Sequence, residues 1–350
     1  MPAGALTSVG IGDDAAVVTT PSGGVVAAVD MVIEGRHFRR DWSTAYDVGV
    51  KAAARSLADI AAMGAVSTAL LVALAAPGSL PARWATDLAE GLASEATRAG
   101  AGIVGGDTAR ADTITLSVTA LGDLEGRAPV LRSGARPGDV IAVSGPLGLS
   151  AAGLALLTAG LAAPPDPLSA PPDPLSALVA AHVRPAPRYA AGPQAARLGA
   201  TAMIDISDGL LADLGHVAAA SGVSINIETP RLPAAPALHQ AAATLLKPQQ
   251  PSLTSAANSP QPTPTNAGQP SQQPATATAR ETALTGEDRA AAMALEWMLT
   301  GGEDHSLVAA FPPGTALPAG WHVIGKALPG TAVTVDGAPH SGPSGWQHFH

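Results

Sequence analysis

The chain has 350 residues and carries 28 acidic against 19 basic side chains, a formal net charge of −9 at pH 7. This balance disfavours nucleic acid as a partner, because binding a phosphate backbone needs a basic surface. There are no cysteines, which excludes disulfides, thiolate metal ligands and a cysteine nucleophile. The sequence has no apolar run near the ~20 residues that span a membrane and no secretory signal at its start. We therefore expect a cytoplasmic protein without a membrane partner.

The first 132 residues alternate apolar segments with alanine-rich ones. Strands are predicted at 25–33, 68–75, 102–104 and 113–121, and helices at 45–63 and 81–99. Ser43 and Thr44 can cap the first helix, and Gly64 suits the left-handed residue that often follows a helix. This alternation predicts an α/β or α+β architecture.

A second region begins at residue 133, so we predict two domains, 1–132 and 133–350. Its strands are predicted at 140–144, 202–204 and 223–227, and its helices at 149–159, 190–198 and 210–220. Two low-complexity inserts interrupt it. The first, at 163–177, contains a tandem proline-rich heptad and is expected to be a loop. The second, at 247–283, is rich in Pro, Gln, Ser and Thr and is expected to be disordered.

Acidic residues recur beside glycine or at the ends of apolar segments. They are Asp13, Asp14, Asp30, Asp59, Asp107, Asp205, Asp208, Glu303 and Asp304. Each alone is compatible with ordinary turn chemistry. If they converge, two unit charges at 4 Å cost about 4 kcal/mol at an effective dielectric of 20. Divalent cations relieve such repulsion, and Mg²⁺ commonly bridges carboxylates to substrate phosphates. Composition alone does not show whether the acids converge.

Two further patterns leave alternatives open. Lys51, Arg55 and Asp59 share one face of the predicted helix 45–63, which is either a solvated stripe or an edge that faces phosphates and metal. The glycine-rich turn at 144–148 precedes a helix and could bind an anion through backbone N–H groups, although tight packing explains it as well. The phosphate-binding loop Gly-x-x-x-x-Gly-Lys-Ser/Thr is missing from the sequence.

Seven short motifs, in this order, together resemble one family. They are Gly-Ile-Gly-Asp-Asp-Ala (10–15), Gly-Arg-His-Phe (35–38), Leu-Ala-Asp-Ile-Ala-Ala-Met-Gly (57–64), Gly-Gly-Asp-Thr (105–108), Leu-Arg-Ser-Gly-Ala-Arg-Pro-Gly-Asp (131–139), Ile-Asp-Ile-Ser-Asp-Gly-Leu (204–210) and Gly-Gly-Glu-Asp (301–304). Their order and spacing resemble the thiamine-monophosphate kinases, within the aminoimidazole-ribonucleotide-synthetase-like superfamily of ATP-using enzymes. The resemblance covers nearly the whole chain outside the two inserts.

The resemblance implies a fold and a reaction. The fold would be a two-domain aminoimidazole-ribonucleotide-synthetase-like one, with an N-terminal sheet domain that forms a homodimer, a C-terminal α/β domain and the site between them. The reaction would be ATP-dependent phosphorylation of thiamine monophosphate to thiamine diphosphate. Several Mg²⁺ ions would assist an in-line transfer, and no strong general base is needed because the acceptor is already a phosphate.

The resemblance also implies residue roles. The metal-binding acids would be Asp14, Asp30, Asp59, Asp107, Asp205 and Asp208. Contacts to ATP would come from Gly106, Asp107, Arg132 and Ser207, and contacts to thiamine monophosphate from His37, Glu303 and Trp346. Among these, Asp30, Asp107, Arg132 and Asp208 are the catalytic candidates. A surface histidine at 37 and a buried core tryptophan at 346 are the competing interpretations for those two positions.

Some features depart from the family pattern. Ala28 and Val29 stand where the family usually has a Ser/Thr pair, Arg55 adds a cation one turn before Asp59, and the segment before the first motif is short. Three other functions therefore stay open: a degenerate protein that binds Mg-nucleotide without turnover, another ATP-dependent enzyme of the superfamily, and a metal-dependent phosphohydrolase. The absence of cysteine argues against the relatives that use a reactive cysteine or selenocysteine.

Overall fold

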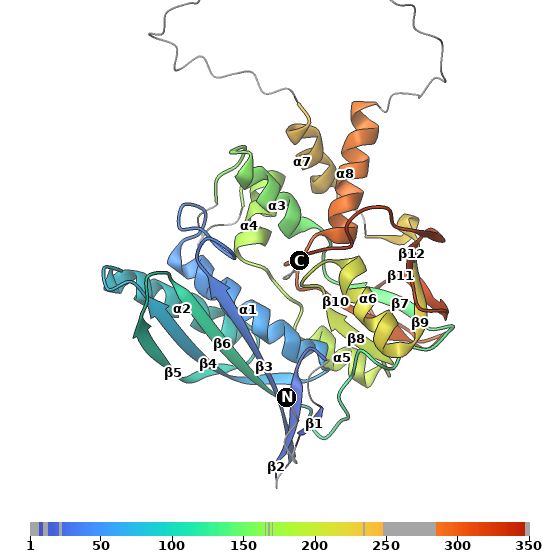
Figure 1. Ribbon diagram of the computed structural model, residues 1–350, viewed down its shortest axis with the longest axis horizontal. Coiled ribbons are helices and arrows are strands. Elements are labelled where there is room, and N and C mark those ends of the chain that lie inside the picture. Colours follow the sequence, from blue (N-terminus) through green and yellow to red (C-terminus); the bar gives the residue numbers. More distant parts are fainter. Residues whose placement is uncertain are drawn as a thin grey trace, which may run out of the picture.

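The computed structural model describes residues 7–9, 13–20, 23–164, 166, 169, 171–233, 235–247 and 285–346. Apart from Lys247, the insert predicted at 247–283 lies outside these residues. The described chain forms two β-sheets with helices packed between and around them (Figure 1). None of the described helices is long and apolar enough to cross a lipid bilayer.

The first sheet has six strands in the order β1-β2-β3-β6-β4-β5. Their bounds are β1 Thr7–Val9, β2 Ala16–Thr20, β3 Gly23–Ile33, β4 Val66–Ala76, β5 Gly102–Arg110 and β6 Thr115–Asp123. Only β4 and β5 pair in parallel. Helices α1 (Ala45–Ala62) and α2 (Ala82–Arg98) pack on one face of this sheet. The opposite face leaves large apolar side chains exposed, among them Val29, Met31 and Leu71.

The second sheet has seven strands in the order β13-β12-β9-β11-β7-β10-β8. Their bounds are β7 Val140–Ser144, β8 Ala202–Asp205, β9 Val223–Ile227, β10 Leu307–Phe311, β11 His322–Pro329, β12 Val333–Val335 and β13 Ala338–Pro339. The accompanying helices are α3 Leu149–Thr158, α4 Pro174–Val183, α5 Ala191–Arg197, α6 Leu210–Ser221, α7 Pro236–Leu245 and α8 Gly286–Thr300. The boundary predicted between residues 132 and 133 falls in the segment that joins the two sheets.

Helix α1 packs against both sheets. Thr44 and Asp47 form a capping box at its start, and Gly64 follows its end with φ 74°, as the sequence predicted. Most of its residues are buried, because one side faces the first sheet while Ile60 and Met63 share a hydrophobic core with Phe311 of the second sheet. Side chains on α1 therefore have fixed positions relative to both sheets.

The predicted elements of the N-terminal half are confirmed, with β5 longer than expected, at 102–110 instead of 102–104. One prediction was wrong. The second proline-rich heptad is not a loop throughout, because α4 begins at Pro174 inside it. Asp173 caps this helix by accepting hydrogen bonds from the N–H groups of Leu175 and Ser176. Proline at the first helical position removes no intrahelical hydrogen bond, so it is tolerated there.

The close approach of α1 and α2 gives a prediction about stability. A Cβ at Gly91 would lie 2.1 Å from the carbonyl oxygen of Tyr46 on α1. We expect Gly91→Ala to lower the free energy of unfolding by about 2 kcal/mol or more, because the clash is with backbone and cannot relax by a rotamer change. Chemical denaturation of both proteins measures this difference in the free energy of unfolding.

Gly215 is the matched control, since it also lies inside a helix, α6, but a Cβ there would meet nothing within 4 Å. Gly215→Ala should raise the free energy of unfolding by about 0.5–1 kcal/mol. Equal effects of the two substitutions would contradict the packing described for α1 and α2.

Candidate active site

Three carboxylates from distant parts of the sequence meet where the two sheets face each other. Asp14 lies just before β2, Asp59 lies on α1, and Asp205 ends β8. One oxygen from each lies within 4.8 Å of one from each of the others. Asp30 is adjacent, because its carboxylate accepts a hydrogen bond from Ser56 on α1 at 3.1 Å. The convergence that composition could not show is thus present for four of the predicted acids.

The charge in this cluster is only partly neutralised. Arg132 donates from Nη2 to Oδ1 of Asp14 at 2.8 Å, and its backbone N–H donates to Asp13 at 2.9 Å. Burial raises the pKa of Asp14 to about 7 in spite of Arg132. Burial, and then the charges of Asp30, Asp205 and Asp14, raise the pKa of Asp59 well above its ordinary value. Burial and mutual repulsion thus both disfavour the ionised form of these acids.

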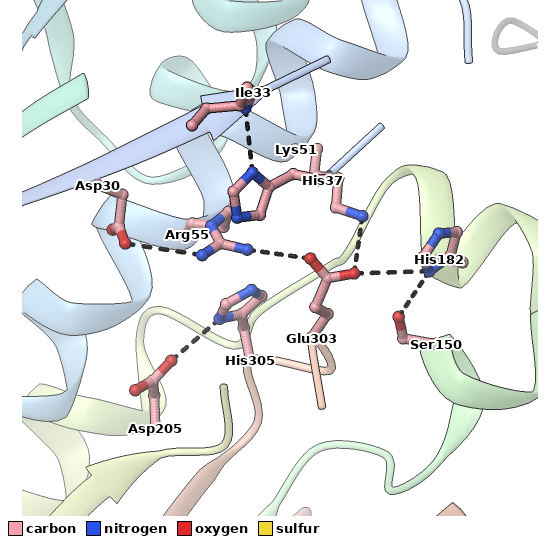
Figure 2. A network of polar contacts seen from close by, with 10 residues as sticks. All are labelled: Asp30, Ile33, His37, Lys51, Arg55, Ser150, His182, Asp205, Glu303 and His305. Carbon is pink, nitrogen blue, oxygen red and sulfur yellow. Dashed lines mark hydrogen bonds and ion pairs between the residues drawn. The ribbon is translucent and has the colours of Figure 1, made fainter. Parts of the chain in front are cut away.

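A second group of charges lies beside the acids and is centred on Glu303. Lys51 donates to Oε2 of Glu303 at 2.9 Å, and Arg55 donates to Oε1 at 3.0 Å (Figure 2). Nδ1 of His182 lies 3.7 Å from Oε2. Burial alone would raise the pKa of Glu303, but Lys51, His182 and Arg55 together lower it to about 2. Glu303 is therefore a fixed anion.

The charged face of α1 points inward and is not a solvated stripe. The side chain of Lys51 is 1% exposed and that of Arg55 13% exposed. Together with Asp59 they place, along one helix, two cations at Glu303 and an acid in the carboxylate cluster. This outcome rules out the solvated stripe, whereas an edge that faces phosphates and metal stays a prediction.

The turn Glu303-Asp304-His305 joins the two groups of charges. Nδ1 of His305 lies 3.0 Å from Oδ2 of Asp205, and both side chains are buried. Since a carboxylate only accepts, Nδ1 carries the proton in this contact. Nε2 of His305 is buried and has no hydrogen-bond partner among the described residues. Glu303 and His305 have φ of 64° and 50°, values rarely adopted outside glycine and typical of functional turns.

The side chain of Asp304, in the middle of this turn, lies at the N-terminus of α3. Its carboxylate accepts hydrogen bonds from the N–H groups of Gly148 and Ser150. Burial raises the pKa of Asp304 to about 7, although these N–H groups oppose the shift. The N–H groups at the glycine-rich turn 144–148 thus bind a carboxyl group of the same protein. Tight packing also applies, because a Cβ at Gly145 would lie 2.3 Å from the hydroxyl of Ser306.

The remaining predicted residues of the second domain lie next to Glu303. The N–H of Glu303 donates to the carbonyl of Ser207 at 2.8 Å, and the N–H of Trp346 donates to that of Asp208 at 2.9 Å. Trp346 is 64% exposed, so the interpretation as a buried core tryptophan is wrong. Nδ1 of His37 accepts from the N–H of Ile33 at 3.0 Å, and the ring lies close to Arg55 in Figure 2.

Gly106 and Asp107 do not reach the acid cluster within this chain. They lie on the edge strand β5, where Asp107 pairs with Ala73, Ala73 with Ser117, and Ser117 with Met31. Three strand spacings, about 14 Å, therefore separate Asp107 from β3. Paired residues share a face of a sheet, so Asp107 lies on the open face with Met31, whereas Asp30 meets α1 on the covered face.

Three residues of the site escaped prediction from the sequence. Ser56 could have been suspected, because it lies three residues before Asp59 on the same helix. His305 directly follows the Gly-Gly-Glu-Asp motif, and this adjacency was a usable signal. His182 had none: it lies on α4, far in sequence from every motif, and reaches Glu303 only because α4 packs beside α3.

The fold and the site together define an AIR synthase related protein. The family model of the N-terminal domain of these proteins matches residues 12–124, and that of the C-terminal domain matches residues 136–254. Within this class the chain belongs to the thiamine-monophosphate kinase family.

Curated relatives and a solved structure carry this assignment. The thiamine-monophosphate kinase of Mycobacterium tuberculosis is 44% identical over 97% of this chain and 85% of its own length. That of Corynebacterium glutamicum is 36% identical over 97% and 88%. A solved structure described as AaThiL complexed with AMPPCP and TMP has a TM-score of 0.76 at 30% identity, covering 97% of this chain and 92% of that one.

The low pKa of Glu303 predicts a pH dependence of stability. A carboxyl with a pKa of about 2 when folded, against an ordinary 4.5, adds stability that is complete above pH ~4.5 and is lost as the pH falls toward 2. Glu303→Gln should lower the free energy of unfolding by about 2 kcal/mol or more at pH 7, because Lys51 loses its buried partner. The difference from wild type should narrow as the pH drops below 4.5.

The control is Glu125→Gln. Glu125 is 51% exposed and pairs with Arg127 on the surface, so its loss should change stability by less than about 0.5 kcal/mol at any pH. Denaturant titrations between pH 3.5 and 7 test both variants. A constant penalty for Glu303→Gln across this range would contradict a charge-dependent role.

Proposed function

We propose that this protein transfers the γ-phosphoryl group of ATP to thiamine monophosphate. The observation that carries the proposal is the convergence of Asp14, Asp59 and Asp205 beside a fixed anion, Glu303. The first group suits a metal-bound triphosphate, and Glu303 is the residue that we expect to contact the ring part of thiamine monophosphate. The names of the relatives and the ligands named for the AaThiL structure support the same substrates.

The residues of the cluster fit Mg²⁺. All donors are carboxylate oxygens, which hard cations prefer, and the raised pKa values of Asp14 and Asp59 mark a deficit of positive charge. Asp14, Asp59 and Asp205 would hold one ion, with Asp30 and Asp208 as ligands of further ions. Bound Mg²⁺ would neutralise the triphosphate and fix its orientation.

The chain's own residues then explain how the acceptor is held. Glu303 stays ionised at any physiological pH and can accept a hydrogen bond from the ring part of thiamine monophosphate, while Lys51 and Arg55 offset its charge. Trp346 exposes an indole that can stack on a flat cationic ring, and His37 lies on the same side of the site. Arg132, fixed by Asp13 and Asp14, supplies a cation at the nucleotide side.

The reaction needs positioning more than acid–base chemistry. An oxygen of the acceptor phosphate forms a bond to the γ-phosphorus while the bond from that phosphorus to the β,γ-bridging oxygen breaks, which releases ADP. The attacking oxygen is already ionised, so no residue has to remove a proton. Burial and Lys51 lower the pKa of His182 to about 3. His182 is therefore neutral at physiological pH and adds no charge to the site. We also propose that the reaction takes place in the cytoplasm, where ATP is available.

One assay tests the proposed function. Purified protein with ATP, MgCl₂ and thiamine monophosphate should yield thiamine diphosphate and ADP in equal amounts, as read by chromatography. Free phosphate without thiamine diphosphate would indicate a phosphohydrolase instead. Nucleotide binding without any product would indicate a degenerate binding protein.

Asp59→Asn tests the metal site. Turnover should fall at least about 100-fold, because the cluster loses a charged ligand. Stability without metal should not fall, since Asp59 is buried among like charges. Added MgCl₂ should raise the melting temperature of wild type but raise that of the variant less. Asp41→Asn, at an exposed acid paired with Arg39, is the control, and equal Mg²⁺ responses of the two variants would argue against this site.

We further propose that the open face of the first sheet is covered by a second copy of the chain. Its exposed apolar side chains include Val29 (63%), Met31 (52%) and Leu71 (40%), and Val104 (65%) lies on the adjacent edge strand β5. Asp107 lines a shallow hollow on this face with Ala73 and Ser117. Since Asp107 cannot serve the acid cluster of its own chain, it serves the partner subunit's cluster if it binds metal at all.

Val104→Asp tests this interface. A buried charge opposite an apolar surface should convert the dimer to a monomer in sedimentation velocity, and turnover should fall at least tenfold because each site then loses the partner's Asp107 and Gly106. Leu154→Asp introduces the same charge at a 40% exposed leucine on α3 and should change neither property. Fully active monomers would disprove a shared site.

A further inference from the structure

Arg55 has more hydrogen-bonding capacity than the protein uses. Its Nη1 donates to Glu303 at 3.0 Å, and its Nη2 lies 3.9 Å from Oδ1 of Asp30, too far for a hydrogen bond. Its Nε is buried and has no partner among the described residues. A guanidinium has five N–H donors, so a largely buried cation is fixed here with at least its Nε–H unsatisfied among the described residues. Buried donors of this kind are rare and ask for an explanation.

Glu303 does not account for this arginine. Lys51 already binds the other oxygen of Glu303 at 2.9 Å and is almost fully buried, so one cation neutralises this one carboxylate. Among the described residues, Asp30 is the other anion beside Arg55, and it lies 3.9 Å from Nη2, so the guanidinium keeps the capacity to bind a further anion. The carboxylate of Asp30 is near, but its hydrogen bond comes from Ser56.

The position of Arg55 identifies which anion this is. In Figure 2 its guanidinium lies between Asp30, on the side of the acid cluster, and Glu303, on the side proposed for the cationic ring. Thiamine monophosphate carries its ring at one end and its phosphate at the other. If the ring lies at Glu303 and the triphosphate at the acids, the acceptor phosphate has to lie between them.

We propose that Arg55 binds the two non-attacking terminal oxygens of the acceptor phosphate through its Nε and a second N–H. The inference rests on the proposed function. Two phosphate groups must approach each other for the transfer, and their repulsion has to be offset on both sides. Cations in the acid cluster do so for the nucleotide, whereas Arg55 does so for the acceptor. The planar guanidinium suits this task because two parallel N–H groups match two phosphate oxygens.

A double-mutant cycle separates a direct phosphate contact from an effect through Glu303. Arg55→Gln should raise KM and the dissociation constant for thiamine monophosphate at least about tenfold, the effect of losing a charged hydrogen bond, and should leave the dissociation constant of Mg²⁺-AMPPCP within twofold. If Arg55 contacts the phosphate, the loss persists when Glu303 is already Gln. If Arg55 only holds Glu303 in place, the loss disappears in that background.

Two further variants complete the test. Arg55→Lys keeps the charge but not the fork and should recover part of the affinity. Arg83→Gln removes the same charge from a 90% exposed site on α2 and should have no effect. An unchanged KM in Arg55→Gln, or a loss that vanishes with Glu303→Gln, overturns the inference alone. A wild-type protein that does not phosphorylate thiamine monophosphate overturns the proposed function, and the inference with it.

Discussion

Mutual repulsion among buried carboxylates is the constraint on which the site depends. Asp14, Asp59 and Asp205 come from three segments of the chain and meet within 4.8 Å, where Arg132 pairs with Asp14 and His305 contacts Asp205. A protein does not gain stability from such a cluster. The fold supports it because α1 is packed between two sheets and cannot move its charged face elsewhere. The hydrophobic core around the cluster therefore holds these carboxylates together against their repulsion, as the proposed binding of Mg²⁺ requires.

The two groups contain charges of opposite sign, and helix α1 contributes to both. Along α1, Lys51 and Arg55 supply positive charge to Glu303, whereas Asp59 adds negative charge to the acid cluster. Because Arg55 and Asp59 are four residues apart on the helix, their positions are about 6 Å apart along its axis. That distance is comparable to the size of a phosphate group, so a substrate that bridges the two groups would be held in line with the triphosphate.

Much of this could be predicted from the sequence, and the exceptions have physical reasons. Strand and helix periodicity located α1, β3 and β7 well, because their apolar residues face a core on a regular repeat. Motif order located the acids. Proline content misled the prediction for α4, since position within a helix matters more than the presence of proline. His182 and the separation of Asp107 from Asp30 depend on tertiary packing and sheet order, which no local pattern encodes.

In the turn Glu303-Asp304-His305, three consecutive side chains contact three different parts of the protein. The first side chain faces Lys51 and Arg55, the second occupies the start of α3, and the third faces Asp205. Two of the three residues have left-handed backbone conformations, which turn successive side chains in divergent directions. Inserting or deleting one residue in this turn would disrupt all three contacts at once. The length of this turn is therefore constrained by three separate side-chain contacts.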